Sequence, residues 1–289
     1  MVEEIIDGIG MKNAKDESLP YPLDKTSLSK LDNASPAQLS ECSKFPYRRV
    51  VGQLMYGMVH TLVSIMYALN VLSRYGNNPG PRHIEFAKHL LRYVKMSKSD
   101  RLKFKTHDGP KDIKTMTEFL QLRFQCDADL AGNLDNLHSQ TSYLGYLGPS
   151  LICWCSTDQG SISTSTAESE IKAVNHTLKA EVIANRGMLS QMGWIQAPTR
   201  IEEDNKACVD ASIITHMTRG LRHLEITENF LKEKYADGTC VLVKIASSDN
   251  NSDIGTKRVT KQVFEKLTNE IVDKSLRIIK VKHSDKMSK

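Results

Sequence analysis

Acidic residues stand where several predicted strands end or helices begin, and carboxylates in such places can hold metal ions. Asp127 ends the first predicted strand, Asp204 follows the fourth, and Asp253 follows the last by a short loop. Glu168 or Glu170 adds a carboxylate in the first turn of a predicted helix. Carboxylates that converge without a basic partner repel one another strongly unless divalent cations neutralise them. Two hard cations held in this way can activate a water and stabilise the leaving oxygen in phosphodiester cleavage.

Each of these acids also has a local interpretation, as a turn residue or a helix cap. Residues 120–126 alternate apolar with polar side chains, which predicts a strand with one buried face. The strand ends at Asp127-Ala128-Asp129, and taken alone these residues favour a turn. The joint placement of carboxylates at the ends of predicted elements makes a metal site as strong a hypothesis as separate turns and caps.

The two glutamates of the helix cannot face the same way, because residues two apart on a helix point about 200° apart. Glu168 lies one turn before Lys172, which favours a paired, solvated position. Glu170 borders the apolar stripe of the helix through Val174. A carboxylate that faces a strand end across a helix–sheet contact needs the second setting, so we favour Glu170.

The elements that must position these acids alternate in type along the chain. Further strands are predicted at 143–148, 151–155, 199–203 and 240–245, and helices at about 165–187, 204–214 and 221–235. The first three strands form an antiparallel meander. The order of three strands, helix, strand, helices and strand predicts an α/β domain, a mixed sheet with helices on its faces. If its first and fourth strands pair, Asp127 and Asp204 lie side by side.

The regions outside this domain differ from it in composition and in predicted structure. Residues 1–46 are Ser-, Lys- and Asp-rich with scattered prolines, which predicts a poorly ordered segment that could only lie over another surface. Residues 47–118 predict a hydrophobic helical hairpin, with helices over about 47–72 and 81–94, followed by a polar connector. Its basic face is interpreted as a solvated side of a packing module. Residues 271–289 form a basic tail, interpreted as a disordered, solubilising end.

Composition places the chain among ordinary globular proteins. Hydrophobic residues make up 40% and charged residues 25%, and the net charge of +5 permits nucleic-acid binding without establishing it. The apolar runs are too short for a membrane span and the acidic start is unlike a signal peptide. The six cysteines have no metal-ligand or disulfide spacing. We therefore expect an intracellular protein, cytoplasmic or nuclear, with no membrane partner.

Several short motifs resemble, in the same order, the C-terminal part of copia-type retrotransposon polyproteins. Upstream, Tyr47-Arg-Arg-Val-Val-Gly-Gln-Leu-Met-Tyr is similar to the segment that joins reverse transcriptase to ribonuclease H. The motifs of the ribonuclease H domain are Asp127-Ala-Asp-Leu-Ala-Gly, Ser163-Thr-Ser-Thr-Ala-Glu-Ser-Glu-Ile, Glu203-Asp-Asn, Arg222-His-Leu-Glu-Ile and Ser252-Asp-Ile-Gly-Thr-Lys. Each motif is weak alone, but their order is specific, and the resemblance covers roughly residues 18–270.

The resemblance implies a ribonuclease H-like domain over residues 119–270 that cuts the RNA strand of an RNA–DNA hybrid. Its catalytic and metal-binding residues would be Asp127, Glu170, Asp204 and Asp253, holding two Mg²⁺ ions or Mn²⁺ in their place. The match selects Asp127 over Asp129 and Glu170 over Glu168. Partners implied are the RNA–DNA hybrid and other parts of the retrotransposon polymerase. His223 also matches the pattern, without an assigned role beyond that of a structural histidine.

Departures from the family pattern support a second hypothesis. The aromatic residue that usually follows the Asp-Ala-Asp motif is Leu130 in this chain, and the Tyr-x-Asp-Asp motif of the polymerase occurs nowhere in it. The chain thus resembles a C-terminal fragment that cannot polymerise. The alternative to an active ribonuclease H is a catalytically decayed, nucleic-acid-binding or scaffolding remnant of the same element. A metal-dependent nuclease of the same fold that acts on DNA is a third possibility.

Overall fold

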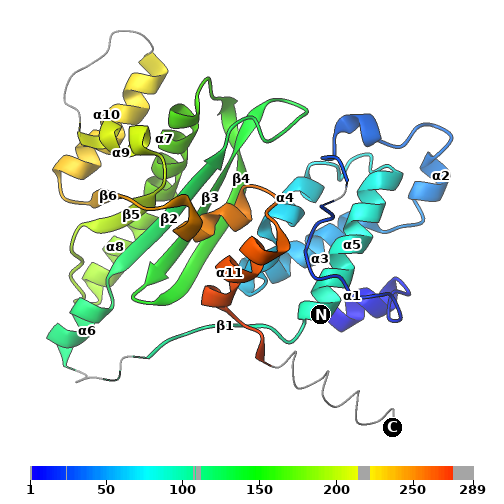
Figure 1. The fold of residues 1–289 in the computed structure, drawn as a ribbon, viewed down its shortest axis with the longest axis horizontal. Coiled ribbons are helices and arrows are strands. Elements are labelled where there is room, and N and C mark those ends of the chain that lie inside the picture. Colours follow the sequence, from blue (N-terminus) through cyan, green and yellow to red (C-terminus); the bar gives the residue numbers. More distant parts are fainter. Residues whose placement is uncertain (1, 24, 107, 109–111, 214–221, 276–289) are drawn as a thin grey trace. The chain divides into compact units, whose positions relative to one another are not determined.

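The computed structural model describes residues 2–23, 25–106, 108, 112–213 and 222–275, and the chain divides into two compact units. The first unit comprises residues 1–103 and those from 258 onward, and the second comprises residues 104–257 (Figure 1). The domain boundaries expected from the sequence, after residues 46, 118 and 270, stay predictions. The basic tail beyond residue 275 lies outside the described residues.

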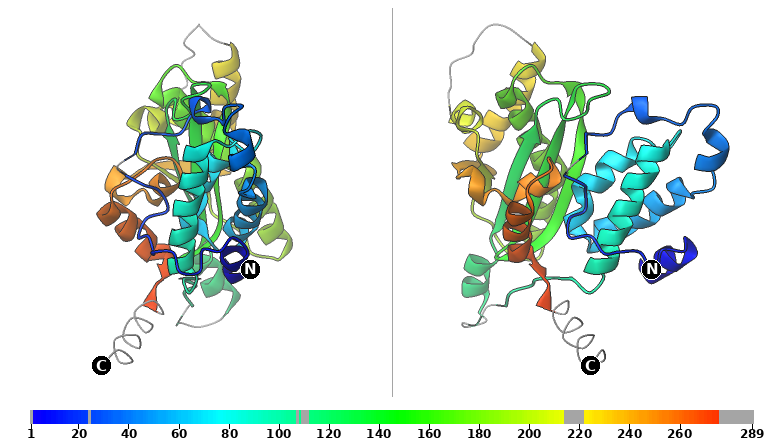
Figure 2. Two further views of the ribbon diagram at one scale, coloured as in Figure 1. Left: turned by 90° about the vertical axis from the view of Figure 1, so that its right-hand side faces the viewer. Right: turned by 45° about the vertical axis from the view of Figure 1, so that its right-hand side comes forward.

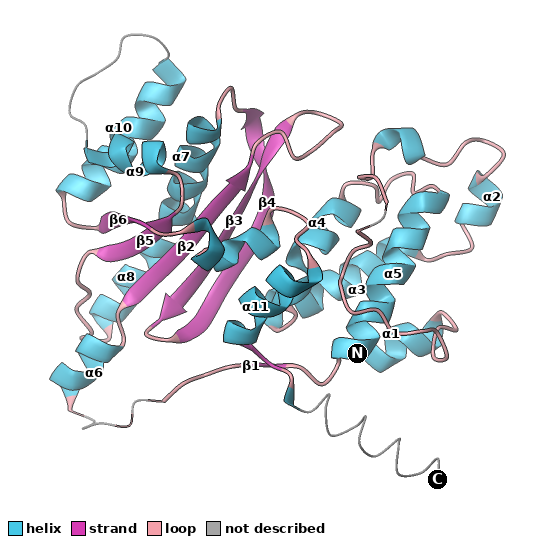
Figure 3. Cartoon of the chain, viewed as in Figure 1, coloured by secondary structure: helices cyan, strands magenta, loops and turns pink. Residues whose placement is uncertain are grey.

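The second unit is built on a five-stranded mixed sheet with the order β4-β3-β2-β5-β6 (Figure 3). Its strands are β2 (Leu122–Asp129), β3 (His138–Leu147), β4 (Ser150–Ile162), β5 (Thr199–Glu203) and β6 (Cys240–Lys244). Strands β2, β3 and β4 pair antiparallel, whereas β5 pairs parallel with both β2 and β6. The mixed α/β sheet flanked by helices that the sequence predicts is confirmed.

Strands β3 and β4 are longer than the apolar runs indicate. Strand β3 begins at His138 and β4 continues to Ile162, so both include polar residues that hydropathy alone assigns to loops. Those side chains find partners inside the unit: Gln159 donates to the Thr141 hydroxyl at 3.0 Å, and Gln140 donates to the Ser156 hydroxyl at 2.8 Å. A strand extends as far as its backbone is paired, and hydrogen bonds let it bury polar side chains.

Helices cover the sheet of the second unit. They are α6 (Ile113–Phe119), α7 (Thr166–Thr177), α8 (Ile183–Gln191), α9 (Lys206–Ile213) and α10 (Arg222–Ala236), with a π-helical turn from Leu178 to Val182 joining α7 to α8. Helix α7 buries Ile171 and Val174 against Phe124 and Cys126 of β2 and Ile201 of β5. Burial of such side chains contributes roughly 1.5–3 kcal/mol each. This contact packs α7 on β2.

The first unit is mainly helical. Its elements are α1 (Val2–Gly8), α2 (Leu39–Cys42), α3 (Tyr47–His60), α4 (Met66–Ser73), α5 (Pro81–Ser97) and α11 (Lys261–Ile271), with short strands β1 (Arg101–Leu102) and β7 (Val272–Asp273) (Figure 2). The first predicted hairpin helix is interrupted, because the N–H groups of Thr61 and Leu62 both donate to the Gly57 carbonyl at 2.9 Å and close α3. Among the described residues, no helix is long and apolar enough to cross a membrane.

Residues 1–46, expected to be poorly ordered, contain little regular structure but contribute to the core of the first unit. Ile5, Ile6 and Tyr21 are buried. The Tyr21 hydroxyl accepts from the Val259 N–H at 2.9 Å, and the Tyr21 ring meets that of Phe264 edge-on at 6.2 Å. The segment therefore lies over other elements of its unit and is anchored there by a few large side chains.

Candidate active site

Three carboxylates converge at one edge of the sheet in the second unit. The ligand atoms of Asp127, Glu170 and Asp204, referred to below as the acidic cluster, all lie within 4.8 Å of one another. The parallel register pairs Gln125 of β2 with Glu202 of β5, so Asp127 and Asp204, each two residues further on, meet at the same edge. The pairing of first and fourth strands thus brings these two acids together.

The local sequence leaves Asp204 available to the cluster. Helix α9 begins at Lys206, and the Asn205 side chain caps it by accepting from the Cys208 N–H at 3.2 Å. Asn205 therefore caps the helix, and the Asp204 carboxylate is not used for that role. Asp204 is half-buried and directed by its position just after β5 toward Asp127.

Helix α7 separates its two glutamates as helical geometry predicts. Glu168 accepts from the Thr164 N–H at 2.8 Å and pairs with Lys172 at 2.8 Å. It therefore stabilises the first turn of the helix. Glu170 is 5% exposed and belongs to the acidic cluster. The Ser165 hydroxyl caps the same helix by accepting from the Glu168 N–H at 3.2 Å. The structure therefore places Glu170, and not Glu168, beside Asp127 and Asp204.

Asp253 lies next to Asp127 but outside the group of three. It sits in a 3₁₀ segment, Asn251–Gly255, whose Gly255 carbonyl accepts from Gln140 at 3.0 Å and from Ser156 at 2.6 Å. Burial and the neighbouring Asp127 raise the pKa of Asp253 to about 7. Hydrogen bonds from β3 thus hold the segment that carries this carboxylate beside Asp127, with a further bond from β4.

A basic partner is present, contrary to the expectation that these carboxylates converge without one. The Lys257 ammonium lies 2.8 Å from Asp253 Oδ1 and 3.7 Å from Asp127 Oδ2. Although burial lowers the pKa of Lys257, Asp127 and Asp253 raise it above its ordinary value. The Thr256 hydroxyl donates to Asp127 Oδ2. Lys257 ends the Ser252–Lys257 motif, four residues after Asp253. This spacing could have predicted an ion pair between the two side chains.

The acidic cluster carries more negative charge than its surroundings compensate. Burial, followed by the charges of Glu203, Asp127 and Asp204, raises the pKa of Glu170 to about 11. Burial also raises the pKa of Glu203 well above its ordinary value. Among the described residues, neither Glu170 Oε2 nor Glu203 Oε2 has a hydrogen-bond partner. Without a cation, such a site binds protons instead.

Glu203 was not assigned a role from the sequence, although it precedes Asp204 in a quoted motif. It is fully buried at the end of β5, on the same face as Ile201 because side chains alternate along a strand. The Asn205 N–H donates to Glu203 Oε1 at 3.0 Å. The period-2 pattern of residues 199–203 could have predicted that the Glu203 carboxylate lies on the buried face of this strand.

The residues present fit a hard divalent cation. Asp127, Glu170 and Asp204 offer carboxylate oxygens at one point, and Glu170 contributes a buried oxygen without a hydrogen-bond partner among the described residues. Oxygen donors of this kind suit Mg²⁺ or Mn²⁺ rather than softer metals. These three residues would therefore hold the ion, with Asp253 beside them.

The remaining motif residues lie apart from the cluster. The Asp129 carbonyl accepts from the Gly132 N–H at 3.3 Å, and a Cβ added to Gly132 would lie 2.5 Å from Asp129 Oδ2. Asp129 is therefore the last residue of β2, where it pairs with Gln140, and its carbonyl closes the turn that follows. His223 falls in the first turn of α10, and its side chain lies outside the described residues.

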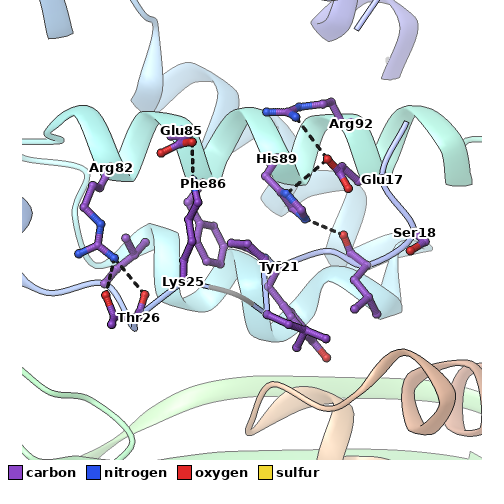
Figure 4. Close-up of a pocket in the computed structure, with 14 residues that line it drawn as sticks. Glu17, Ser18, Tyr21, Lys25, Thr26, Arg82, Glu85, Phe86, His89 and Arg92 are labelled. Carbon is purple, nitrogen blue, oxygen red and sulfur yellow. Dashed lines mark hydrogen bonds and ion pairs between the residues drawn. The ribbon is translucent and has the colours of Figure 1, made fainter. Parts of the chain in front are cut away.

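The first unit contains a separate polar cavity of about 430 Å³, between residues 17–28 and helix α5 (Figure 4). We call it the α5 cavity. Its acidic and basic side chains are paired with one another or with a neighbour: Lys25 with Glu85, Arg82 with Asp32, and Arg92 with Glu17. The ring of His89 contacts the Leu19 carbonyl at 3.0 Å through Nε2. Because these charges are balanced locally, the cavity is a weaker candidate site than the acidic cluster.

Comparison with known proteins identifies relatives of the chain. No family model matches it. Among solved structures, LC11-RNase H1 in complex with an RNA/DNA hybrid has 11% sequence identity, a TM-score of 0.38, and coverage of 47% of this chain and 94% of that chain.

Curated sequences match over more of the chain. It is 31% identical, over 94% of its length, to the retrovirus-related Pol polyprotein from transposon TNT 1-94 of Nicotiana tabacum. It is 26% identical, over 78% of its length, to the corresponding polyprotein from transposon RE1 of Arabidopsis thaliana. The matched regions span 19% and 15% of those polyproteins. The chain is therefore a homologue of the retrovirus-related Pol polyproteins of plant transposons.

Proposed function

We propose that this chain is a ribonuclease H that hydrolyses the RNA strand of RNA–DNA hybrids, with Asp127, Glu170, Asp204 and Asp253 as its catalytic carboxylates. The observation that carries the proposal is the acidic cluster, three carboxylates within 4.8 Å at the edge of a mixed sheet. Homology to Pol polyproteins supports a hydrolase acting on nucleic acid. The hybrid substrate rests on the motif resemblance, and its recognition would use the minor groove and 2′-hydroxyl groups rather than base sequence.

The side chains of the site have distinct tasks in this proposal. Asp127, Glu170 and Asp204 supply the oxygens that hold Mg²⁺ or Mn²⁺, and the Thr256 hydroxyl fixes the orientation of the Asp127 carboxylate. Bound there, the metal would polarise the scissile phosphate and promote deprotonation of the attacking water. Asp253 adds negative charge at the side of Asp127, and the hydrogen bonds from Gln140 and Ser156 keep its loop in place.

Cleavage of labelled substrates by the purified chain tests the proposal. RNA–DNA hybrid, duplex DNA and duplex RNA are offered side by side with Mg²⁺, Mn²⁺ or a chelator. We expect metal-dependent cutting of the RNA strand of the hybrid alone, and a loss of at least ~100-fold in Asp204→Asn, because removal of one preorganised charged group costs several kcal/mol in the transition state.

The matched control is Asp210→Asn. Asp210 lies on α9, outside the acidic cluster, and its carboxylate is 2.6 Å from the Lys206 ammonium. This variant should therefore cleave at the normal rate. No cutting with either metal, or unchanged cutting by Asp204→Asn, would reject the enzymatic proposal. Binding of the hybrid without cleavage would instead support a non-catalytic remnant, and preferential cutting of duplex DNA would reassign the substrate.

A further inference from the structure

The carboxylates of the proposed site do not share one environment. Asp127, Glu170 and Asp204 face one another within 4.8 Å, and Glu170 Oε2 is a buried oxygen without a hydrogen-bond partner among the described residues. Asp253 Oδ1 also lacks a hydrogen-bond partner among the described residues, but it forms an ion pair with the Lys257 ammonium at 2.8 Å. The chain itself therefore supplies a positive charge beside Asp253, and this charge also lies 3.7 Å from Asp127 Oδ2.

The Lys257 ammonium is held by the fold on the side of Asp253. The Lys257 N–H donates to the Asp253 carbonyl at 3.3 Å, so the backbone turns tightly between the two residues. The preceding Thr256 hydroxyl donates to Asp127 Oδ2, and the Gly255 carbonyl accepts from Ser156 at 2.6 Å. With the backbone on either side of Thr256 fixed, the lysine side chain reaches Asp127 Oδ2 at 3.7 Å as well as Asp253.

We propose that Lys257 is the permanent counter-cation of Asp127 and Asp253 and restricts the site to one tightly bound divalent cation, held by Asp127, Glu170 and Asp204. The inference rests on the metal site of the proposed function and replaces the two ions that the family resemblance implies. A fixed positive charge a few ångströms away opposes a second divalent ion through direct Coulomb repulsion and by occupying carboxylate oxygens that the ion needs. Lys257 is thus a positioning residue for Asp253 and a determinant of metal stoichiometry.

The stoichiometry of Mn²⁺ binding to the full chain, without nucleic acid, tests this role. Isothermal titration and the electron paramagnetic resonance signal of free Mn²⁺ provide independent measures. We expect one tight Mn²⁺ in the unmodified protein. In Lys257→Met, which keeps most of the side-chain length and removes the charge, we expect a second Mn²⁺ whose affinity rises at least ~10-fold, since each tenfold change needs only about 1.4 kcal/mol of lost repulsion.

Two further variants separate charge from packing. Lys257→Arg keeps the positive charge and should retain one tight ion. Lys206→Met removes an exposed lysine that pairs with Asp210 and should also retain one. Two equally tight ions in the unmodified protein, or a single ion in Lys257→Met with unchanged secondary structure by circular dichroism, would overturn the proposal.

The measurement also distinguishes this inference from the function on which it rests. If Mn²⁺ binds but hybrids are not cleaved, the proposed activity fails while the ion count still decides the role of Lys257. If no Mn²⁺ binds to any variant, both the metal site and the role of Lys257 are rejected.

Discussion

The α5 cavity of the first unit and the acidic cluster of the second unit both gather charged side chains, but they compensate those charges in opposite ways. In the α5 cavity Lys25 contacts Glu85, and Arg92 contacts Glu17 at 3.3 Å (Figure 4). Arg82 pairs with Asp32. In the acidic cluster, Asp127, Glu170 and Asp204 face one another. Lys257 compensates part of this charge, at 2.8 Å from Asp253 Oδ1 and 3.7 Å from Asp127 Oδ2.

This comparison distinguishes charged side chains that are paired within the protein from like charges that are stabilised by binding a proton or a cation. A locally paired set needs nothing further to be stable, and each exposed pair contributes little. Buried like charges raise one another's pKa and remain unfavourable until a proton or a cation arrives. Glu170, whose pKa burial and neighbouring carboxylates raise to about 11, belongs to the second class. Charge imbalance, more than cavity size, is therefore what marks the candidate site.

Substitution of the two glutamates of α7 should give the largest contrast. Glu170→Gln removes a carboxylate of the cluster and should lower metal-dependent hybrid cleavage at least ~100-fold, because a ligand charge is lost where charge develops in the transition state. Glu168→Gln breaks the pairing with Lys172 and should leave cleavage within about threefold, since Glu168 lies outside the acidic cluster. Steady-state cleavage of the labelled hybrid checks both. Equal losses in the two variants would contradict the assignment of Glu170.

Thermal unfolding of the metal-free protein should show the charge imbalance directly. The folded-state pKa of Glu170, about 11, and that of Asp253, about 7, both lie above the ordinary values of 4.5 and 3.8. Such groups stabilise the fold fully below their ordinary pKa and lose that contribution as pH rises toward the raised values. The midpoint of unfolding, followed by circular dichroism, should therefore fall from pH 5 to pH 9.

Divalent cation should reverse this loss. At a Mg²⁺ concentration of about 100 times its dissociation constant, binding adds about 2.7 kcal/mol, or roughly 5–10 °C in the unfolding midpoint. The gain should be larger at pH 9 than at pH 5, where protons compete for the carboxylates. Glu170→Gln should show a smaller fall with pH and a smaller gain with Mg²⁺. A midpoint that rises with pH in the absence of metal would contradict the unfavourable crowding of these carboxylates.

Disruption of the α5 cavity should have the smallest effect. Arg92→Met removes the contact with Glu17 and keeps much of the side-chain volume, so it should cost about 1 kcal/mol or less in the free energy of unfolding. Mn²⁺ binding and hybrid cleavage should not change. Urea denaturation measures the first effect, and the binding titration measures the second. A large loss of cleavage in this variant would show that the balanced charges of the cavity also serve function.

The main strands and helices, and the acidic residues of the candidate site, were predicted from the amino-acid sequence. Period-2 alternation identified β2, and the order of strands and helices predicted a mixed sheet. The angular separation of residues on a helix was enough to favour Glu170 over Glu168. These features depend on residues near one another in the chain, where periodicity is informative. The parallel pairing of β2 with β5 then explains why Asp127 and Asp204 share an edge.

The groups that surround those carboxylates are known only from the folded structure. Lys257 contacts Asp127, which lies 130 positions earlier in the sequence. Gln140 of β3 and Ser156 of β4 both donate to the Gly255 carbonyl and so hold the segment that precedes Lys257. The burial of Glu203 and the extent of β3 and β4 likewise depend on partners distant in the chain. Local patterns carry no information about such contacts, because charge compensation at a buried site is a sum over neighbours that folding alone brings together.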